Sequence, residues 1–164
     1  MIKLDGVIHQ LPRELKVTIL IFICTLSIGF YSGLSFVRAT TSMGAKGIET
    51  HYLGNEDDEN AEIMKFKKNK QQMLSVVHNH ILSLSVIFFL LAVILSITSI
   101  PKRVKYFLMI EPFVSVFLTF GGLYMLWSGF TWFKYIVIIS GTLRTLSFLI
   151  STILVVQQLV FSKK

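Results

Sequence analysis

The stretch ILSLSVIFFLLAVILSITSI, residues 81–100, decides the fold class of this chain. Its twenty residues carry no charge, and Pro101, Lys102 and Arg103 follow directly. Twenty residues of helix rise about 30 Å, which matches the hydrocarbon core of a bilayer. Proline disfavours helix for the residue before it, and basic side chains favour lipid headgroups. The stretch therefore predicts a membrane-spanning helix that ends at Ile100.

Three further apolar runs predict a bundle of four spanning helices. The predicted spans are 17–37, 74–100, 106–127 and 132–161. The first run is longer than the apolar core of a cleaved signal peptide, and no small-residue cleavage site follows it, so it is interpreted as an anchor. The last three spans are joined by short connections and are expected to be antiparallel neighbours. The expected fold is an all-α integral membrane protein, a four-transmembrane-helix bundle that forms one domain over residues 1–164.

One long polar segment, residues 39–73, interrupts the apolar runs and is predicted to be a loop between the first and second spans. It contains an acidic cluster at 56–59 and a basic stretch at 65–70. The acidic cluster lacks the alternating ligand spacing of a calcium-binding loop, so a solvated loop is expected there. The basic stretch is expected to lie along the lipid headgroups before the second span enters the bilayer.

Composition and charge exclude a soluble nucleic-acid-binding protein. Hydrophobic residues make up 53% of the chain and charged residues only 15%, against about 25% charged residues in typical globular chains. A soluble protein of this size could not cover so much apolar surface. The net charge is +7, but the basic residues gather at the ends of the apolar runs, where lipid headgroups attract them. The expected partner is the lipid bilayer, and no nucleic acid is expected.

The orientation in the membrane follows from the placement of positive charge. An even number of crossings puts both termini and the connection at 102–105 on one side. The two sides carry similar numbers of Lys and Arg, but the short connection is densely basic, whereas residues 130–133 on the other side are mostly aromatic. Positive residues are retained on the cytoplasmic side, so both termini are expected in the cytoplasm.

Histidines at the start of the second span are the first candidate ligands. His78 and His80 flank Asn79, and a neutral imidazole is a good ligand for haem iron or for a transition metal. Residues two apart on a helix point about 200° apart, so both cannot face one metal on a regular helix. His51 could fold back from the polar segment and complete a metal site with His78 and His80, or support a haem b held by one of them. The alternative is an interfacial helix start whose histidines bond to water and loop carbonyls.

Arg144 and Glu111 are charged residues within predicted spans. Arg144 lies near the bilayer midplane, and Ser140, Ser147 and Ser151 share its helix face, so this face should point into the bundle. Arg144 is therefore a candidate cofactor-binding residue, toward a haem propionate or a quinone, with a purely structural role as the alternative. Glu111 is interpreted as an interfacial residue near a helix start, too shallow for direct contact with Arg144.

Two glycines in the first span, Gly29 and Gly33, are spaced as in helix-packing motifs. Close packing against a second helix is favoured over a ligand site, and that helix could equally belong to another subunit. The chain has no nucleophile elbow, phosphate-binding loop, paired cysteines or metalloprotease helix, so no catalytic residue is assigned.

The sequence GIETHYLGNE at residues 47–56, followed by a basic stretch and by His78 and His80, resembles a loosely defined set of small bacterial inner-membrane proteins. The resemblance covers about one third of the chain. It implies a four-helix protein of the bacterial inner membrane, associated with respiratory and cytochrome components. That set has no assigned activity, so no catalytic residue is carried over.

Two functional hypotheses follow. The first is a membrane subunit associated with respiratory electron transfer that binds haem b or a metal through His78, His80 and His51, with Arg144 beside the group. The alternative is a non-catalytic structural or assembly subunit of a larger membrane complex, in contact with other membrane subunits or with further copies of itself. A proton or solute carrier using Glu111 and Arg144 ranks third, because the chain shows no inverted repeats or broken helix pairs.

Overall fold

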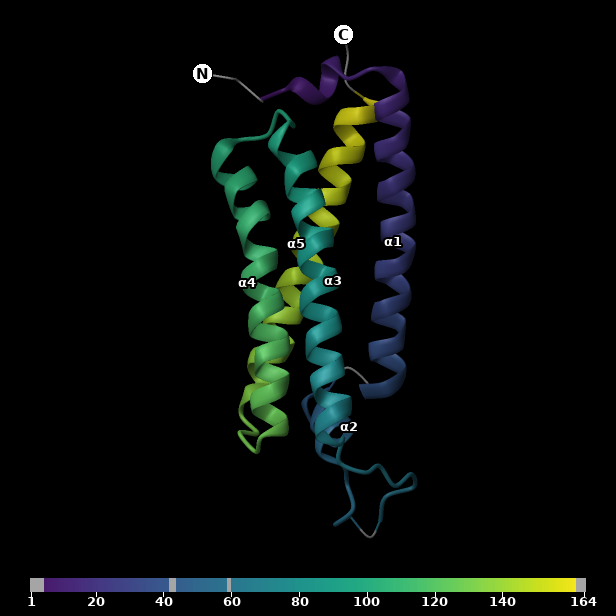
Figure 1. The fold of residues 1–164 in the computed structure, drawn as a ribbon, viewed down its shortest axis with the longest axis vertical. Helices are drawn as coiled ribbons and strands as arrows, with labels where there is room; N and C mark the ends of the chain where they lie inside the picture. Colours follow the sequence, from purple (N-terminus) through teal and green to yellow (C-terminus); the bar gives the residue numbers. More distant parts are fainter. Residues whose placement is uncertain (1–4, 42–43, 59, 162–164) are drawn as a thin grey trace.

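The computed structural model describes residues 5–41, 44–58 and 60–161, and within these ranges every regular element is a helix. The elements in chain order are η1 (Val7–Gln10), α1 (Arg13–Thr41), α2 (Ala45–Leu53), α3 (Lys70–Ser96), α4 (Lys102–Trp127) and α5 (Phe133–Val160). Helices α1, α3, α4 and α5 are long and apolar enough to cross a membrane, which confirms the four predicted spans. They run side by side along the long axis of the molecule (Figure 1).

Local hydrogen bonding explains where α3 begins and ends. The helix begins at Lys70 because Asn69 and Gln72 form a capping box. The backbone N–H of Gln72 donates to Asn69 Oδ1 at 2.8 Å, and that of Asn69 donates to Gln72 Oε1 at 3.0 Å. The helix ends at Ser96, four residues before the predicted end, where backbone bonds between residues three apart tighten the last turn.

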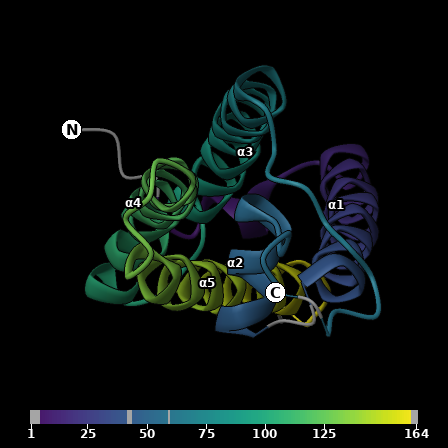
Figure 2. The same ribbon diagram turned by 90° about the horizontal axis from the view of Figure 1, so that it is seen from below.

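Helices α4 and α5 form the most closely packed pair, and α3 packs against α4. The turn from α4 to α5 uses Gly129 at φ 108°, a left-handed conformation that glycine adopts without steric cost. Phe88 of α3 makes an edge-to-face contact with Phe148 of α5, with ring centroids 6.5 Å apart. The last three spans are therefore antiparallel neighbours, as the short connections predict (Figure 2).

Helix α1 is held loosely. In its most apolar stretch only 6% of the residues are buried, against 50% in α4. Its contact with α5 includes the stacked rings of Phe30 and Phe148, whose centroids are 4.0 Å apart. A Cβ atom placed on Gly29 or Gly33 would meet nothing within 4 Å. The prediction that these glycines pack against another helix of this chain is therefore wrong, and contact with another subunit stays a prediction.

The predicted long polar loop between the first two spans is not observed as one loop. Helix α1 continues to Thr41, and α2 begins only a few residues later, at Ala45, so the gap between these two helices is short. Helix α2 is tied to the bundle by an ion pair of 2.5 Å between Glu49 and Lys134 of α5. Composition indicated a polar segment here, but tertiary contacts of its apolar residues, such as Ile48, stabilise a helix within it.

The basic stretch before α3 is folded against α2 and α4. The backbone N–H of Lys68 donates to Tyr52 O at 3.2 Å, and the indole of Trp127 donates to Lys68 O at 2.7 Å. Gly54 permits this approach: it has φ 86°, and a Cβ there would lie 2.8 Å from Lys65 O. Because Trp127 and Tyr52 favour the membrane–water boundary, this end of the bundle marks one surface of the bilayer.

At the opposite end of the bundle, the N-terminal segment that contains η1 contacts the end of α3 and the start of α4. The backbone N–H of Ile8 donates to Ile97 O at 3.0 Å, and Lys105 Nζ forms a 2.7 Å ion pair with Asp5. The chain thus enters α1 and leaves α5 at the same end as the basic connection, as an even number of crossings requires (Figure 1). Which side of the membrane this end faces stays a prediction.

Candidate functional site: a polar layer inside the bundle

Small hydroxyl side chains form a buried seam between α4 and α5. Thr119 and Ser140 are hydrogen-bonded through their side-chain oxygens at 2.8 Å. Ser147 and Ser151 continue the seam along α5 and are at most 2% exposed. The prediction that this face of α5 points into the bundle is therefore confirmed. Small side chains allow the two helices to approach closely, and the Thr119 and Ser140 hydroxyls bond to each other there, whereas the buried Ser151 hydroxyl has no hydrogen-bond partner.

Glu111 lies inside this seam on α4. It is 7% exposed, so it is buried among the helices, and its expected depth near one surface of the membrane stays a prediction. Ser115, one helical turn further along, donates a hydrogen bond to Glu111 Oε1, while Glu111 Oε2 is buried without a hydrogen-bond partner. The sequence did not predict this burial, which follows from the packing of α4 against α3 and α5. A carboxyl oxygen left unsatisfied at this depth is costly.

Arg144 enters the same layer from α5. Its guanidinium carbon lies 5.3 Å from the centre of the Phe120 ring, at cation–π distance. Its Nε and Nη1 atoms are buried without hydrogen-bond partners, and it forms no ion pair with Glu111. The predicted lack of direct contact between the two residues is therefore confirmed.

His80 of α3 is exposed and covers the Phe120 ring from the outside of the bundle. Its ring stacks on Phe120 with centroids 4.7 Å apart and an interplanar angle of 25°. Its Nδ1 lies 2.8 Å from the carbonyl oxygen of Val76. If Nδ1 carries the proton and donates it to that carbonyl, Nε2 is left as an acceptor or metal ligand. Phe120, which sequence reasoning did not single out, thus lies against side chains from both neighbouring helices.

The other two predicted ligands lie elsewhere. His78 is exposed on α3 and, as expected for residues two apart, does not share the direction of His80. His51 lies on α2 with its ring edge-on to Tyr52 at 4.9 Å. Burial lowers the pKa of His51, and the nearby charges of Lys68 and Lys65 lower it further.

The three predicted histidine ligands are not gathered into one group. Among the described residues, no three His, Cys, Asp or Glu side chains lie close enough together to hold a metal ion. The predicted site of His51, His78 and His80 is thus not formed in this structure. Ligation by one of these histidines together with groups from another molecule stays a prediction.

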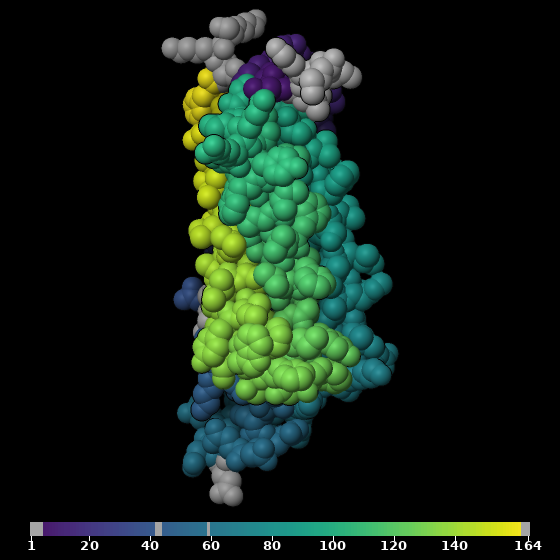
Figure 3. Space-filling model, turned by 90° about the vertical axis from the view of Figure 1, so that its left-hand side faces the viewer, coloured from purple at the N-terminus to yellow at the C-terminus, as the bar shows by residue number. Residues whose placement is uncertain are grey.

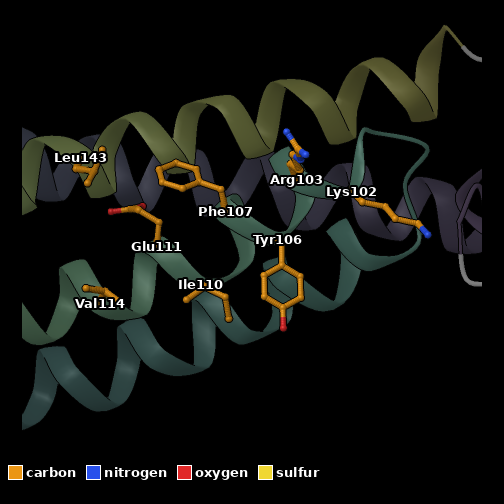
Figure 4. Close-up of a pocket in the computed structure, with 8 residues that line it drawn as sticks. All are labelled: Lys102, Arg103, Tyr106, Phe107, Ile110, Glu111, Val114 and Leu143. Atoms are coloured by element: carbon orange, nitrogen blue, oxygen red, sulfur yellow. The ribbon is translucent and has the colours of Figure 1, made fainter.

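A membrane-facing groove of about 800 Å³ runs beside the polar layer, along α4 and next to Leu143 of α5. Figure 3 shows the face of the molecule on which α4 and α5 lie together. Figure 4 shows Phe107 and Glu111 directed from α4 toward α5, with Lys102 and Arg103 at the end where α4 begins. Glu111 is thus one of the residues that line the groove, and its carboxyl oxygen Oε2 is buried behind the groove surface.

No curated protein and no solved structure matches this chain. A family model described as a transmembrane helical domain, Aq_1264_TM, matches residues 42–164, three quarters of the chain. The matched region contains α2 to α5 and begins where α1 has just ended. This boundary agrees with the loose packing of α1 on the remaining helices. The chain is an integral membrane protein that belongs to this family of transmembrane helical domains.

Proposed function

We propose that this protein is a non-catalytic subunit of a larger membrane assembly that contains at least two copies of the chain. The observation that carries the proposal is a polar stripe on the exposed face of α3, formed by Ser75, Asn79 and Ser83. Residues four apart on a helix lie on one face, so the three side chains form a continuous row.

The stripe lies at membrane depth. Asn79 is nine residues from the start of α3, or about 14 Å along the helix axis. Its amide donates to Ser75 Oγ at 3.2 Å, and Ser83 donates to the backbone carbonyl of Asn79 at 2.6 Å. Neither bond uses the side-chain oxygen Oδ1 of Asn79. A polar side chain in contact with hydrocarbon is unfavourable, whereas a hydrogen bond to another helix would stabilise it.

A second copy of the chain fits this stripe best. Copies in one membrane share one orientation, so a two-fold axis between them must lie along the membrane normal. Two α3 helices would then run parallel, with Asn79 of one copy at the depth of Asn79 of the other. An asparagine side chain both donates and accepts, so it is complementary to itself. The stripe also carries no ionisable residue that would repel its symmetry mate.

Replacing Asn79 by leucine tests this proposal. For Asn79→Leu we expect the dimer dissociation constant to rise about tenfold, because interhelical hydrogen bonds in membranes contribute about 1–2 kcal/mol in model peptides. The measurement is the mass of the purified full-length protein in mild detergent by light scattering over a concentration series. Thr142→Leu is the matched control, because Thr142 is also exposed and lies nine residues after the start of α5.

A wild-type protein that stays monomeric at every concentration would contradict the homomeric assembly. Recovery from native membranes with a different fixed partner, lost in Asn79→Leu, would assign the stripe to a heteromeric contact instead.

A second candidate function, one-electron transfer through haem b, is favoured by the geometry of His80. An Nδ1–H donated to a backbone carbonyl orients an imidazole for ligation through Nε2. Because His78 points elsewhere, the second axial ligand would come from His80 of the other copy. Arg144, on the same Phe120 ring, would then be placed to pair with a haem propionate.

Haem binding is tested by dithionite-reduced minus oxidised absorption spectra of the protein purified from its own membrane. We expect haem b bands that His80→Ala removes and His78→Ala, the matched control, retains. A preparation without haem absorbance would refute this second function and leave the assembly proposal unaffected.

A further inference from the structure

We propose that the groove beside α4 and α5 binds a quinol-type molecule from the bilayer, an aromatic ring with hydroxyl groups, one of which donates a hydrogen bond to Glu111 Oε2. This site is separate from the polar stripe of α3, so the proposal does not depend on the assembly. Figure 4 shows the residues that line the groove.

The groove opens to the membrane, and its ligand must therefore be soluble in lipid. Apart from Glu111 and the basic residues at its end, its lining is aromatic or aliphatic, and every lining residue belongs to a spanning helix. Phe107, Ile110 and Val114 are each more than half exposed. Its volume of about 800 Å³ lies within the range of roughly 300–1,000 Å³ typical of small-molecule sites.

Glu111 supplies the polar group that would select a ligand with a hydrogen-bond donor. Its side chain is buried, Ser115 already satisfies Oε1, and Oε2 has no hydrogen-bond partner. Both Glu111 and Leu143 line the groove, and the carboxyl is directed toward Leu143 (Figure 4). Because Oε2 is buried behind the groove surface, a ligand that reaches it must displace Leu143 or Phe107. A hydroxyl donor there would satisfy the orphaned oxygen, and the Phe107 ring offers an apolar surface for an aromatic ligand.

An anionic phospholipid is the other molecule that this groove could attract, and the position of its charges argues against it as the preferred ligand. Lys102 and Arg103 lie at the start of α4, nine and eight residues before Glu111, so roughly 12–14 Å separates them along the helix. A phosphate at these residues would place an acyl chain beside Glu111. Hydrocarbon has no donor, so Oε2 would remain unsatisfied.

The test uses the full-length protein in nanodiscs of zwitterionic lipid, titrated with decylubiquinol under reducing conditions. We expect saturable binding by calorimetry and a shift of the Glu111 carboxyl band in difference infrared spectra, absent in Glu111→Gln. We expect Glu111→Ala to weaken binding at least tenfold, because a hydrogen bond to a buried carboxyl is lost. Leu118→Ala, at an exposed position of α4 outside the groove lining, is the matched control and should bind within about threefold of wild type.

A ligand variant keeps the test independent of protein folding. The dimethyl ether of decylubiquinol has the same ring but no hydroxyl donor, and it should bind wild-type protein at least tenfold more weakly. Equal binding of quinol and ether, or of wild type and a folded Glu111→Ala, would overturn the proposal. So would binding that phosphatidylglycerol displaces in wild type but not in a Lys102→Gln, Arg103→Gln double variant, since the groove would then be a phospholipid site.

Discussion

At the scale of single residues, the charged pair Glu111 and Arg144 shows how the bundle accommodates polarity. The two residues lie on the most closely packed helix pair and do not form an ion pair. Ser115 donates a hydrogen bond to Glu111, and the guanidinium of Arg144 lies over the face of the Phe120 ring. Each retains buried polar atoms without partners, which costs free energy unless a ligand or partner satisfies them. Such residues inside a membrane are functional candidates for this reason.

His51 gives a prediction at this scale, because its environment disfavours its protonated form. Burial and the charges of Lys68 and Lys65 lower its pKa from the ordinary value of 6.5. The unfolded segment therefore binds more protons than the folded one as the pH falls through about 6.5. The contribution of His51 to the stability of α2 is complete above this pH and is lost as the pH falls toward the folded-state pKa.

We expect the backbone amides of α2 to exchange faster with solvent at pH 5.5 than at pH 7.5, after correction for the intrinsic pH dependence of exchange. Hydrogen exchange with mass spectrometry measures this difference. His51→Gln cannot titrate and should show no corrected difference between the two pH values. An identical pH response in wild type and variant would assign the effect to another group.

At the scale of elements, the helices differ in how much each contributes to the bundle. Helices α3, α4 and α5 pack on one another, whereas α1 lies beside α5 and is largely exposed. Phe148 of α5 receives an aromatic side chain from each side, Phe88 of α3 and Phe30 of α1. Phe88 is 2% exposed, and Phe30 is only partly buried. Phe148 therefore makes aromatic contacts in two different interfaces, the buried one with α3 and the largely exposed one with α1.

Truncating these two rings compares the interfaces directly. Phe88→Ala removes a fully buried ring and should lower the free energy of unfolding by about 3–5 kcal/mol. Phe30→Ala should cost about 1 kcal/mol, chiefly the loss of one aromatic stack. Thermal unfolding of the full-length protein in detergent, followed by circular dichroism, checks the order. Equal losses would show that α1 belongs to the cooperative core.

At the scale of the whole molecule, hydropathy predicts the spans and little beyond them. Four long apolar runs, proline and lysine at their ends, and short connections indicated the number of crossings and the antiparallel order of α3, α4 and α5. The inward face of α5 was predictable too, because Ser140, Ser147 and Ser151 recur at helical spacing around Arg144. These features are local, and each follows from the rise and periodicity of a helix.

Helix α2, the burial of Glu111 and the separation of the histidines required the tertiary structure. Hydropathy cannot distinguish a lipid-facing apolar helix from a packed one, because hydrocarbon and a neighbouring helix are equally apolar. For this reason α1 was expected to pack through Gly29 and Gly33, and the central position of α4 was not foreseen. The sequence alone determined that the chain crosses a bilayer four times as a helical protein. Only the packing of the helices decided which charged groups are buried and which polar face is left exposed.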